Sequence, residues 1–127
     1  MDSQPNETAA AHTGRTGEEA AAEWLRRAGY ELCARNWRQG RYELDIVARK
    51  AGVVHIVEVK TRRAGSLTPP EAALTLQKFR ALSRAAASFL TASGMDGWEV
   101  QFDLAAVEIT PDGPRVRFIE NAMEYNW

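Results

Sequence analysis

In the stretch from Gly40 to Arg63, two mainly apolar runs flank a short polar segment. Val, Ile and Tyr dominate both runs, and these residue types favour β-strands over helices. The polar segment between them, residues 49–52, ends in a glycine, as tight turns often do. The pattern therefore predicts a β-hairpin whose turn is centred between Ala51 and Gly52.

A helix and a strand are predicted before this hairpin. Residues 1–13 lack apolar periodicity and are expected to form a disordered tail. A helical stripe of apolar residues follows, with Thr16 as a candidate N-terminal cap and Gly29 as a natural stop. A strand is then predicted over residues 30–37, and one of its faces would carry Tyr30, Leu32 and Ala34.

The second half of the chain predicts a long helix and two more strands. Residues 61–70 are rich in turn-forming and basic residues and are expected to form a loop. The helix runs from about Glu71 to about Ala92, and the strands span Trp98–Ile109 and Arg115–Ile119. A long helix between two neighbouring strands makes a parallel connection, so we expect an α/β sandwich around a mixed sheet.

Composition places the chain among ordinary globular proteins. Its 127 residues are 45% hydrophobic and 26% charged, which predicts one domain, residues 14–127, behind the tail. The chain starts without a basic, apolar leader, and no stretch reaches transmembrane length, so no membrane association is expected. Cys33 is the only cysteine, which excludes an intrachain disulfide and fits a reducing cytoplasm.

The charges are unevenly distributed, although the net charge is only −1. Basic residues gather around the hairpin and in residues 60–84, whereas the C-terminal part is acidic. This pattern suits a polyanionic ligand that approaches from one side, and solvated polar surfaces are the alternative. The candidate nucleic-acid-binding residues are Arg62, Arg63, Lys78, Arg80 and Arg84.

The hairpin register brings acidic residues together. In an antiparallel pair with this turn, the numbers of directly opposed residues add to about 103. Asp45 then faces Glu58, and Glu43 faces Lys60, with opposed Cβ atoms roughly 4.5–5.5 Å apart. Because side chains two apart share a face, all four project the same way. Asp45 and Glu58 are therefore close enough to share one cation.

Paired carboxylates of this kind suit Mg²⁺ or Mn²⁺, which prefer hard oxygen ligands. Such a cation activates a water and neutralises charge on a phosphodiester, and Lys60 would stand beside it. The alternative is an ordinary hairpin whose solvated face carries cross-strand ion pairs. Val54 and Ile56 lie on the same face as Glu58, however, and a partly buried charge needs a partner or a function.

Asp45, twelve intervening residues and then Glu58-Val59-Lys60 resemble the D…(D/E)-x-K signature of the PD-(D/E)XK nuclease superfamily. The wider sequence, from roughly Gly14 to Val107, resembles the YraN-like family of small bacterial proteins, which are predicted endonucleases. More distantly, it is similar to archaeal Holliday junction resolvases. The matching segments are Gly17-Glu18-x-x-Ala21-x-x-Trp24-Leu25, Gly29-Tyr30, Arg35-Asn36, residues 43–48 and residues 57–62.

The resemblance implies a restriction-endonuclease-like αβββαβ core and a metal-dependent nuclease that hydrolyses phosphodiester bonds in DNA or structured nucleic acid. Asp45, Glu58 and the Val59 carbonyl would bind the metal, and Lys60 would assist the water or the transition state. Accessory roles would fall to Glu18, Glu43 and one of Gln77 and Lys78. Two positions depart from the family pattern: Tyr42 replaces a usual Gly, and Gln101 replaces a usual Arg before Phe102-Asp103.

The sequence also allows other interpretations. The chain could be a non-catalytic nucleic-acid-binding or assembly subunit that keeps the nuclease fold. Glu18 could simply stabilise the first turn of its helix. His55 lies on the face opposite Glu58, and Asp103 lies far along the chain, so neither is assigned to the metal. The apolar residues of the segment 123–127 could form a homodimer contact or fold back on the domain.

Overall fold

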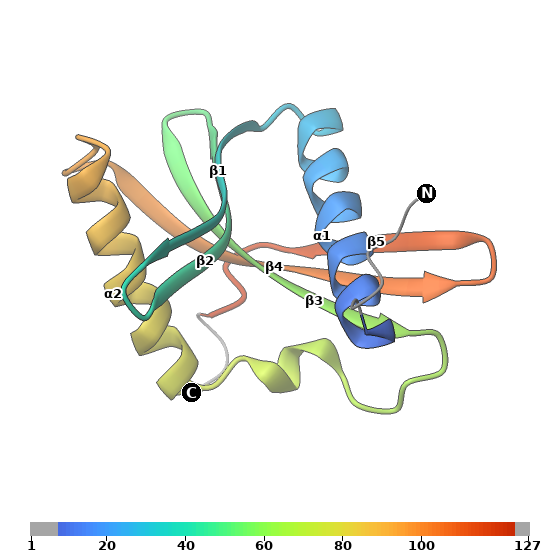
Figure 1. Ribbon diagram of the computed structural model, residues 1–127. Helices are drawn as coiled ribbons and strands as arrows, with labels where there is room; N and C mark the ends of the chain where they lie inside the picture. The colour runs from blue at the N-terminus through green and yellow to red at the C-terminus, as the bar shows by residue number, and fades with distance from the viewer. Residues whose placement is uncertain (1–7, 124–127) are drawn as a thin grey trace.

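Within residues 8–123, five β-strands form one mixed sheet in which they lie in the order of the sequence, from β1 to β5. The computed structural model of the protein describes residues 8–123. The elements are α1 (Ala9–Arg27), β1 (Glu31–Gln39), β2 (Tyr42–Lys50), β3 (Val53–Arg63), the 3-10 helix η1 (Pro70–Ala73), α2 (Leu76–Ala92), β4 (Glu99–Thr110) and β5 (Gly113–Ile119) (Figure 1). This order confirms the predicted α/β class and is consistent with an αβββαβ-type core.

The central strands reproduce the predicted hairpin and crossover. β2 and β3 are antiparallel, and Ile46 lies opposite Val57, as the predicted register requires. β3 and β4 are parallel, because η1 and α2 carry the chain back across the sheet between them. The remaining neighbours, β1 with β2 and β4 with β5, are antiparallel.

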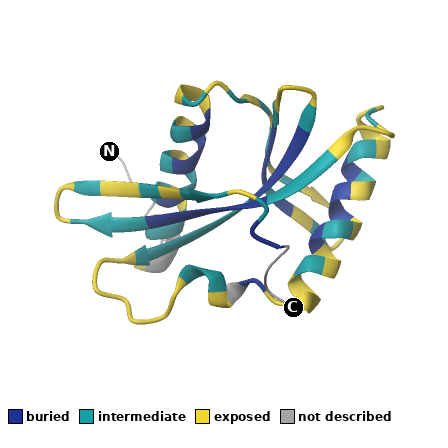
Figure 2. Ribbon diagram, turned by 180° about the vertical axis from the view of Figure 1, so that it is seen from behind, coloured by how far each residue is buried: buried dark blue, intermediate teal, exposed yellow. Residues whose placement is uncertain are grey.

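The two helices pack against opposite faces of the sheet, so each face has its own core. On the α1 face, the buried residues are Ala21, Ala22, Leu25, Ile46, Ala48, Val57, Ala105 and Val107. On the α2 face, they include Leu44, Val47, Val54, Ile56, Leu82, Ala85, Phe89 and Leu104. Figure 2 shows buried positions along the sheet and on one side of each helix. Within residues 8–123, neither helix combines the length and the apolar character that crossing a membrane requires.

Both helices begin at positions that differ from the sequence-based expectation. α1 starts at Ala9 rather than near Thr16, so residues 9–13 are helical, and residues 1–7 of the expected tail lie outside the described residues. Residues 9–11 are alanines, whose high helix propensity carries the helix past its apolar stripe. The second helix begins at Leu76 rather than Glu71, because Thr75 caps it by accepting a hydrogen bond from Lys78 N at 3.1 Å.

Strand β1 does not keep Leu32 and Ala34 on one face, so that expectation is wrong. Its pairing with β2 shifts register between these two residues, which is the signature of a β-bulge. Leu32 consequently packs in the core on the α1 face, and Ala34 packs in the core on the α2 face.

Candidate active site where two strands diverge

The site lies where β2 and β3 separate. The two strands are paired from the turn as far as Ile46 and Val57. Beyond Val57, β3 is paired with β4 but no longer with β2. Beyond that point β2 runs toward α2, and β3 runs in the other direction (Figure 1). Asp45, the next residue of β2, replaces the missing strand partner, because its Oδ2 accepts a hydrogen bond from Val59 N at 2.8 Å. We call this opening between β2 and β3 the fork.

The backbone at the fork is distorted in both strands of the β1–β2 pair. Leu44 packs in the core on the α2 face, whereas Ile46 packs on the α1 face, so the regular alternation of β2 breaks at Asp45. On β1, Asn36 has a φ of 50°, a left-handed conformation in which Asn is the commonest residue after Gly. The distortion lets Asp45 bond to β3 instead of following the regular pleat.

Glu58 meets Asp45 at the fork, although the regular pairing of β2 with β3 ends one residue earlier, at Ile46 and Val57. Its side chain follows Val54 and Ile56 on the α2 face and is 16% exposed. Burial, then the neighbouring Asp45 carboxylate, raises the pKa of Glu58 to about 7, although Lys78 partly opposes this. The two carboxyl groups are also hydrogen-bonded to each other, so one proton between them relieves their repulsion.

Lys78 supplies the positive charge that the pair lacks. The Thr75 cap starts α2 beside the fork, and Lys78 Nζ lies 3.0 Å from Glu58 Oε2. Burial lowers the pKa of Lys78, but Glu58, Asp45 and Glu43 outweigh this effect and raise it. Of the two candidates on this helix, the structure brings Lys78 to the site. Gln77 is exposed, and its side chain makes no hydrogen bond within residues 8–123.

Glu18 approaches Asp45 from α1. The helix passes very close to β3, since a Cβ placed on Gly17 would lie 2.8 Å from the Cβ of Thr61. Only glycine permits this contact, and the next residue, Glu18, consequently lies near Asp45. Burial and the Asp45 charge raise the pKa of Glu18, whereas Arg35 and a hydrogen bond from Asn36 act in the opposite direction.

Asn36 was not among the predicted site residues, yet it combines a left-handed backbone with a hydrogen bond to Glu18. Its neighbour Arg35 also lies near Glu18, and its NH1 is 3.1 Å from Glu19 Oε2. The sequence could have pointed to both residues, because the pair Arg35-Asn36 is one of the segments that match the family. Asn36 thus bonds to Glu18, and Arg35 places a positive charge near it.

The predicted opposition of Glu43 and Lys60 is wrong. The strands have already separated at these positions, so Glu43 is paired with Arg38 of β1, at 3.7 Å, instead. Lys60 lies two residues beyond Glu58 on the same strand and forms no ion pair within the described part of the chain. It is therefore the free cation nearest to Glu58 along β3.

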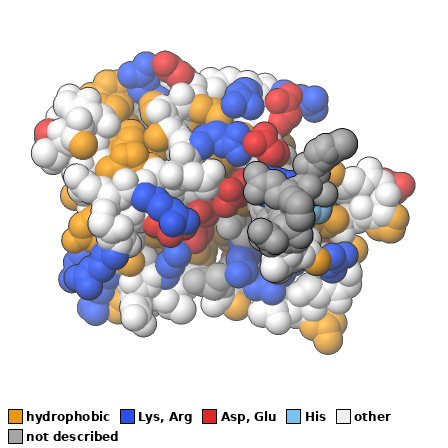
Figure 3. Space-filling model, viewed as in Figure 1, with side chains coloured by type: hydrophobic (Ala, Val, Ile, Leu, Met, Phe, Trp, Pro, Cys, Tyr) orange, Lys and Arg blue, Asp and Glu red, His pale blue; other side chains and the backbone are white. Residues whose placement is uncertain are grey.

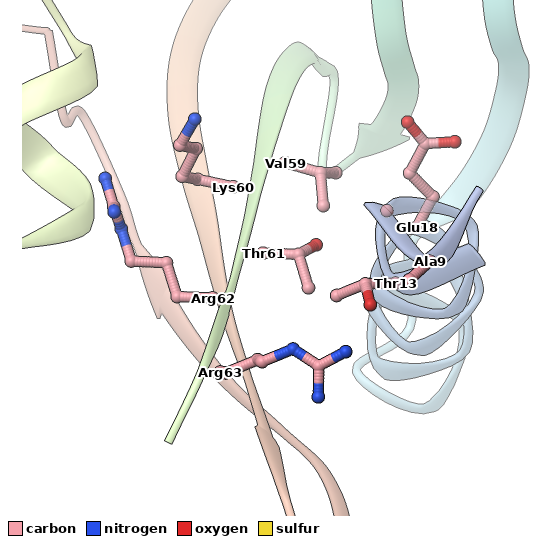
Figure 4. Close-up of a pocket in the computed structure, with 9 residues that line it drawn as sticks. Ala9, Thr13, Glu18, Val59, Lys60, Thr61, Arg62 and Arg63 are labelled. Carbon is pink, nitrogen blue, oxygen red and sulfur yellow. The ribbon is translucent and has the colours of Figure 1, made fainter. Parts of the chain in front are cut away.

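A cavity of about 480 Å³ separates α1 from the open edge of β3. In Figure 4, Thr61 and Arg63 point toward α1, whereas Lys60 and Arg62 point to the opposite side of the strand. Thr13 and Glu18 line the cavity from the helix. The Val59 N–H points to Asp45, and because a residue's N–H and C=O share a direction in a strand, its carbonyl faces the same opening.

The donor atoms at the fork are all oxygens, which suits Mg²⁺ or Mn²⁺. Within residues 8–123, no three His, Cys, Asp or Glu side chains are arranged as a metal-binding group. Asp45 and Glu58 alone match the one or two carboxylates that usually hold Mg²⁺ together with waters and substrate phosphates. The donor set therefore fits the metal, on the condition that Lys78 leaves Glu58.

The basic residues predicted to bind nucleic acid lie on β3 and on α2, the elements that carry Glu58 and Lys78. Arg62 and Arg63 continue β3 beyond Lys60, on opposite faces of the strand (Figure 4). Arg80 and Arg84 are exposed on α2 and form no ion pairs with other described residues. Acidic side chains lie near the middle of the molecular surface in Figure 3, with Lys and Arg side chains next to them.

His55 and Asp103 form a separate buried pair on the α1 face. His55 Nδ1 lies 2.6 Å from Asp103 Oδ2, and both residues are buried. Asp103 Oδ1 accepts hydrogen bonds from Gln101 Nε2 and Asn121 N, each at 2.9 Å. As the sequence predicts, His55 lies on the face opposite Glu58, and Asp103 is not part of the fork.

The comparison with known proteins gives the family. Residues 17–107 match the family described as "Uncharacterised protein family UPF0102". A relative from Symbiobacterium thermophilum is 44% identical over 110 residues, which cover 86% of this chain and 93% of the relative. A relative from Geobacter sulfurreducens is 43% identical over 112 residues, 87% of this chain and 88% of the relative. The chain therefore belongs to the UPF0102 family, the YraN-like family that its motifs resemble.

Proposed function

We propose that the protein is a metal-dependent nuclease of the PD-(D/E)XK type, which hydrolyses phosphodiester bonds in DNA or structured nucleic acid. The observation that carries the proposal is the meeting of Asp45 and Glu58 at the fork, with the pKa of Glu58 raised to about 7 by burial and by Asp45. Groups whose pKa is shifted by burial and a like charge, in an open cleft, are typical of functional sites.

Each residue has a role that its contacts support. A bound Mg²⁺ or Mn²⁺ would activate a water and neutralise charge on the phosphodiester. Asp45 is oriented by the Val59 N–H, so its second oxygen would be a ligand, together with Glu58 once Lys78 leaves it. Lys60, free of ion pairs within residues 8–123, would orient the water or stabilise the transition state. Glu18, oriented by Asn36, would act as an accessory carboxylate.

The substrate would be a nucleic acid, with DNA as the expected form. Its phosphates would lie against the exposed basic side chains of β3 and α2, and the reaction would take place in the cytoplasm. The protein would also form a homodimer through the apolar residues of the segment 123–127, of which residues 124–127 lie outside the described residues. Light scattering at high protein concentration tests it, and a strict monomer would remove it.

A non-catalytic nucleic-acid-binding or assembly role is the second candidate, and one contact favours it. Lys78 already neutralises Glu58 at 3.0 Å, so the fork needs no metal to be stable. In this alternative, the carboxylates and Lys78 form a structural ion-pair network, and the basic surface binds nucleic acid without cleaving it.

Thermal unfolding with and without Mn²⁺ separates the two candidates. A metal site predicts that Mn²⁺ at 100 times its Kd stabilises the wild type by about 2.7 kcal/mol and leaves Glu58→Gln unchanged. Glu99→Gln is the matched control, because Glu99 is an exposed carboxylate on β4, outside the fork. Titration calorimetry with Mg²⁺ or Mn²⁺ should give the same pattern.

A cleavage screen with Mn²⁺ over duplex, single-stranded, flap and four-way DNA then tests the reaction itself. The nuclease proposal expects cleavage by the wild type and by Glu99→Gln, and none by Glu58→Gln. If the wild type neither takes up metal nor cleaves any of these substrates, the nuclease proposal is wrong and the non-catalytic role replaces it.

A further inference from the structure

A second cavity, of about 320 Å³, lies beyond Lys60 on the α2 face of the sheet. It is enclosed by β3, β4, β5 and the segment that leads to η1. The strand register aligns its charged residues, since Arg62 pairs with Glu108 and Glu108 pairs with Arg115. In the adjacent row, Ala106 pairs with Arg117. Three arginines from two strands therefore project from one face of the sheet toward this cavity.

The arginines are not fully neutralised. Arg115 NH1 is 3.9 Å from Glu108 Oε1, and Arg117 NH1 is 3.3 Å from Glu71 Oε2. Arg62 has no ion pair among residues 8–123, and its Nε is buried without a hydrogen-bond partner. A buried donor without an acceptor costs about 1–3 kcal/mol. The cavity therefore has an excess positive charge and an N–H group that a ligand oxygen would satisfy.

The position of the cavity relative to the fork is fixed by β3. Glu58, Lys60 and Arg62 are spaced two residues apart on one face of the strand, and Figure 4 shows Lys60 and Arg62 on the same side. Each two-residue step is about 6.6 Å, from the usual strand rise. An extended polyanion that follows β3 would thus reach the cavity directly after the candidate site.

The lining residues indicate the chemistry of the ligand. Arginine presents a planar fork of N–H donors, which suits phosphate oxygens. Ser66 and Thr68 add hydroxyl groups from the loop, and hydroxyl groups commonly contact phosphates in nucleic-acid complexes. A phosphate group has enough acceptors to bind several of these donors at once.

We infer that this cavity, which we call the arginine cavity, is a phosphate-binding subsite that holds a second phosphate of the nucleic acid, next to the phosphate at the fork. This inference rests on the proposed function. The phosphate can be an internal phosphodiester or a terminal phosphate group, and the chemistry of recognition is the same for both. In either case, Arg62 positions the substrate relative to Glu58 and Lys60.

Inorganic phosphate tests the subsite directly. In EDTA, so that metal plays no part, phosphate should raise the melting temperature of the wild type and of Arg26→Gln. Arg26 is the matched control, an exposed arginine at the end of α1, outside the arginine cavity. Phosphate should have no such effect on Arg62→Gln and a reduced effect on Arg115→Gln. Circular dichroism checks that each variant is folded.

Oligonucleotide binding, measured by fluorescence anisotropy in EDTA, identifies the source of the phosphate. Arg62→Gln should bind a single-stranded oligodeoxynucleotide about tenfold more weakly than the wild type, with a salt slope smaller by about 0.7. A terminal phosphate predicts that the loss is confined to oligonucleotides with a 5′-phosphate. An internal phosphate predicts the same loss for 5′-hydroxyl oligonucleotides.

The inference is overturned if Arg62→Gln and Arg115→Gln bind phosphate and oligonucleotide as tightly as the wild type does. Metal uptake and cleavage by the wild type would then still support the proposed function. Conversely, a wild type that binds phosphate through Arg62 but takes up no Mn²⁺ would keep the subsite and remove the nuclease. The two failures are therefore distinguishable.

Discussion

Strand β3 carries two polar clusters, one buried and one partly buried, which start three residues apart on opposite faces and are built in different ways. On the α1 face, His55 meets Asp103. On the α2 face, Glu58 meets Asp45 and Lys78. The carboxylate of Asp103 is fully buried and that of Glu58 only partly, so the more deeply buried carboxylate is not the one at the candidate site.

The clusters differ in how completely the carboxylates are satisfied. Asp103 is fully buried, and both of its oxygens accept hydrogen bonds, from His55, Gln101 and Asn121. At the fork, by contrast, two carboxyl groups face each other, and the pKa of Glu58 is raised to about 7 by burial and by Asp45. A buried network whose groups are all hydrogen-bonded stabilises a fold, whereas two neighbouring carboxyl groups repel each other in their charged forms, and a bound cation would relieve that repulsion.

The largest expected effect is the loss of stability on removing Asp103. Asp103→Ala leaves His55 and the Asn121 N–H without partners, so the free energy of unfolding should fall by about 3–5 kcal/mol. Asp45→Ala should change it by about 1 kcal/mol or less, because the lost bond to Val59 is offset by relief of repulsion. Urea unfolding at pH 8 in EDTA measures both variants, and equal losses would contradict the contrast between the clusters.

The effect of pH on the free energy of unfolding should lie between the large effect of Asp103→Ala and the small effect of Lys78→Gln. The pKa of Glu58 is raised from its ordinary 4.5 to about 7, so between these values the folded protein keeps a proton that the unfolded chain releases. Stability from this group is present below pH 4.5 and declines as the pH rises through 7, by on the order of 3 kcal/mol.

The measurement is the free energy of unfolding from pH 4.5 to pH 8 in EDTA, for the wild type and Glu58→Gln. Other titrating groups are common to both proteins, so the difference between the two curves reports Glu58. The variant should lack this part of the decline and be the more stable protein at pH 8. Parallel curves would show that Glu58 is an ordinary ion-pair partner of Lys78.

The smallest effect on stability is expected for Lys78→Gln. The Lys78 side chain is 44% exposed, so loss of its ion pair should cost about 1 kcal/mol or less. Affinity for Mn²⁺ should rise, however, because the metal no longer displaces an ammonium group from Glu58. Titration calorimetry with Mn²⁺ compares the affinity of Lys78→Gln with that of Arg84→Gln, which removes the same charge from an exposed position of α2. Weaker Mn²⁺ binding by Lys78→Gln would mean that Lys78 does not occupy the cation position.

The hairpin and its acidic pair could be predicted from the sequence, because both depend on local geometry. A turn centred on Ala51 and Gly52 dictates the register that places Ile46 opposite Val57. Alternation along the strand then puts Glu58 on the face of Val54 and Ile56. These relations involve residues close in the chain, so no knowledge of the remaining fold is needed.

The remainder of the site depends on contacts between distant segments. The regular register predicts Glu43 opposite Lys60, yet the strands separate at the fork, where Asp45 accepts a hydrogen bond from Val59 N. The choice between Gln77 and Lys78 follows from where the Thr75 cap begins α2, and periodicity alone places that start several residues too early.

The sequence by itself thus determined the element order, the hairpin register and the identity of the two central carboxylates. Tertiary structure decided what surrounds them, which is the approach of α1 at Gly17 and the ion pair of Lys78. It also decided the contact between His55 and Asp103 on the other face of the sheet. The physical reason is that a turn and a strand limit side-chain directions over a few residues. Distant elements, by contrast, meet only through the packing of the whole sheet and its two helices.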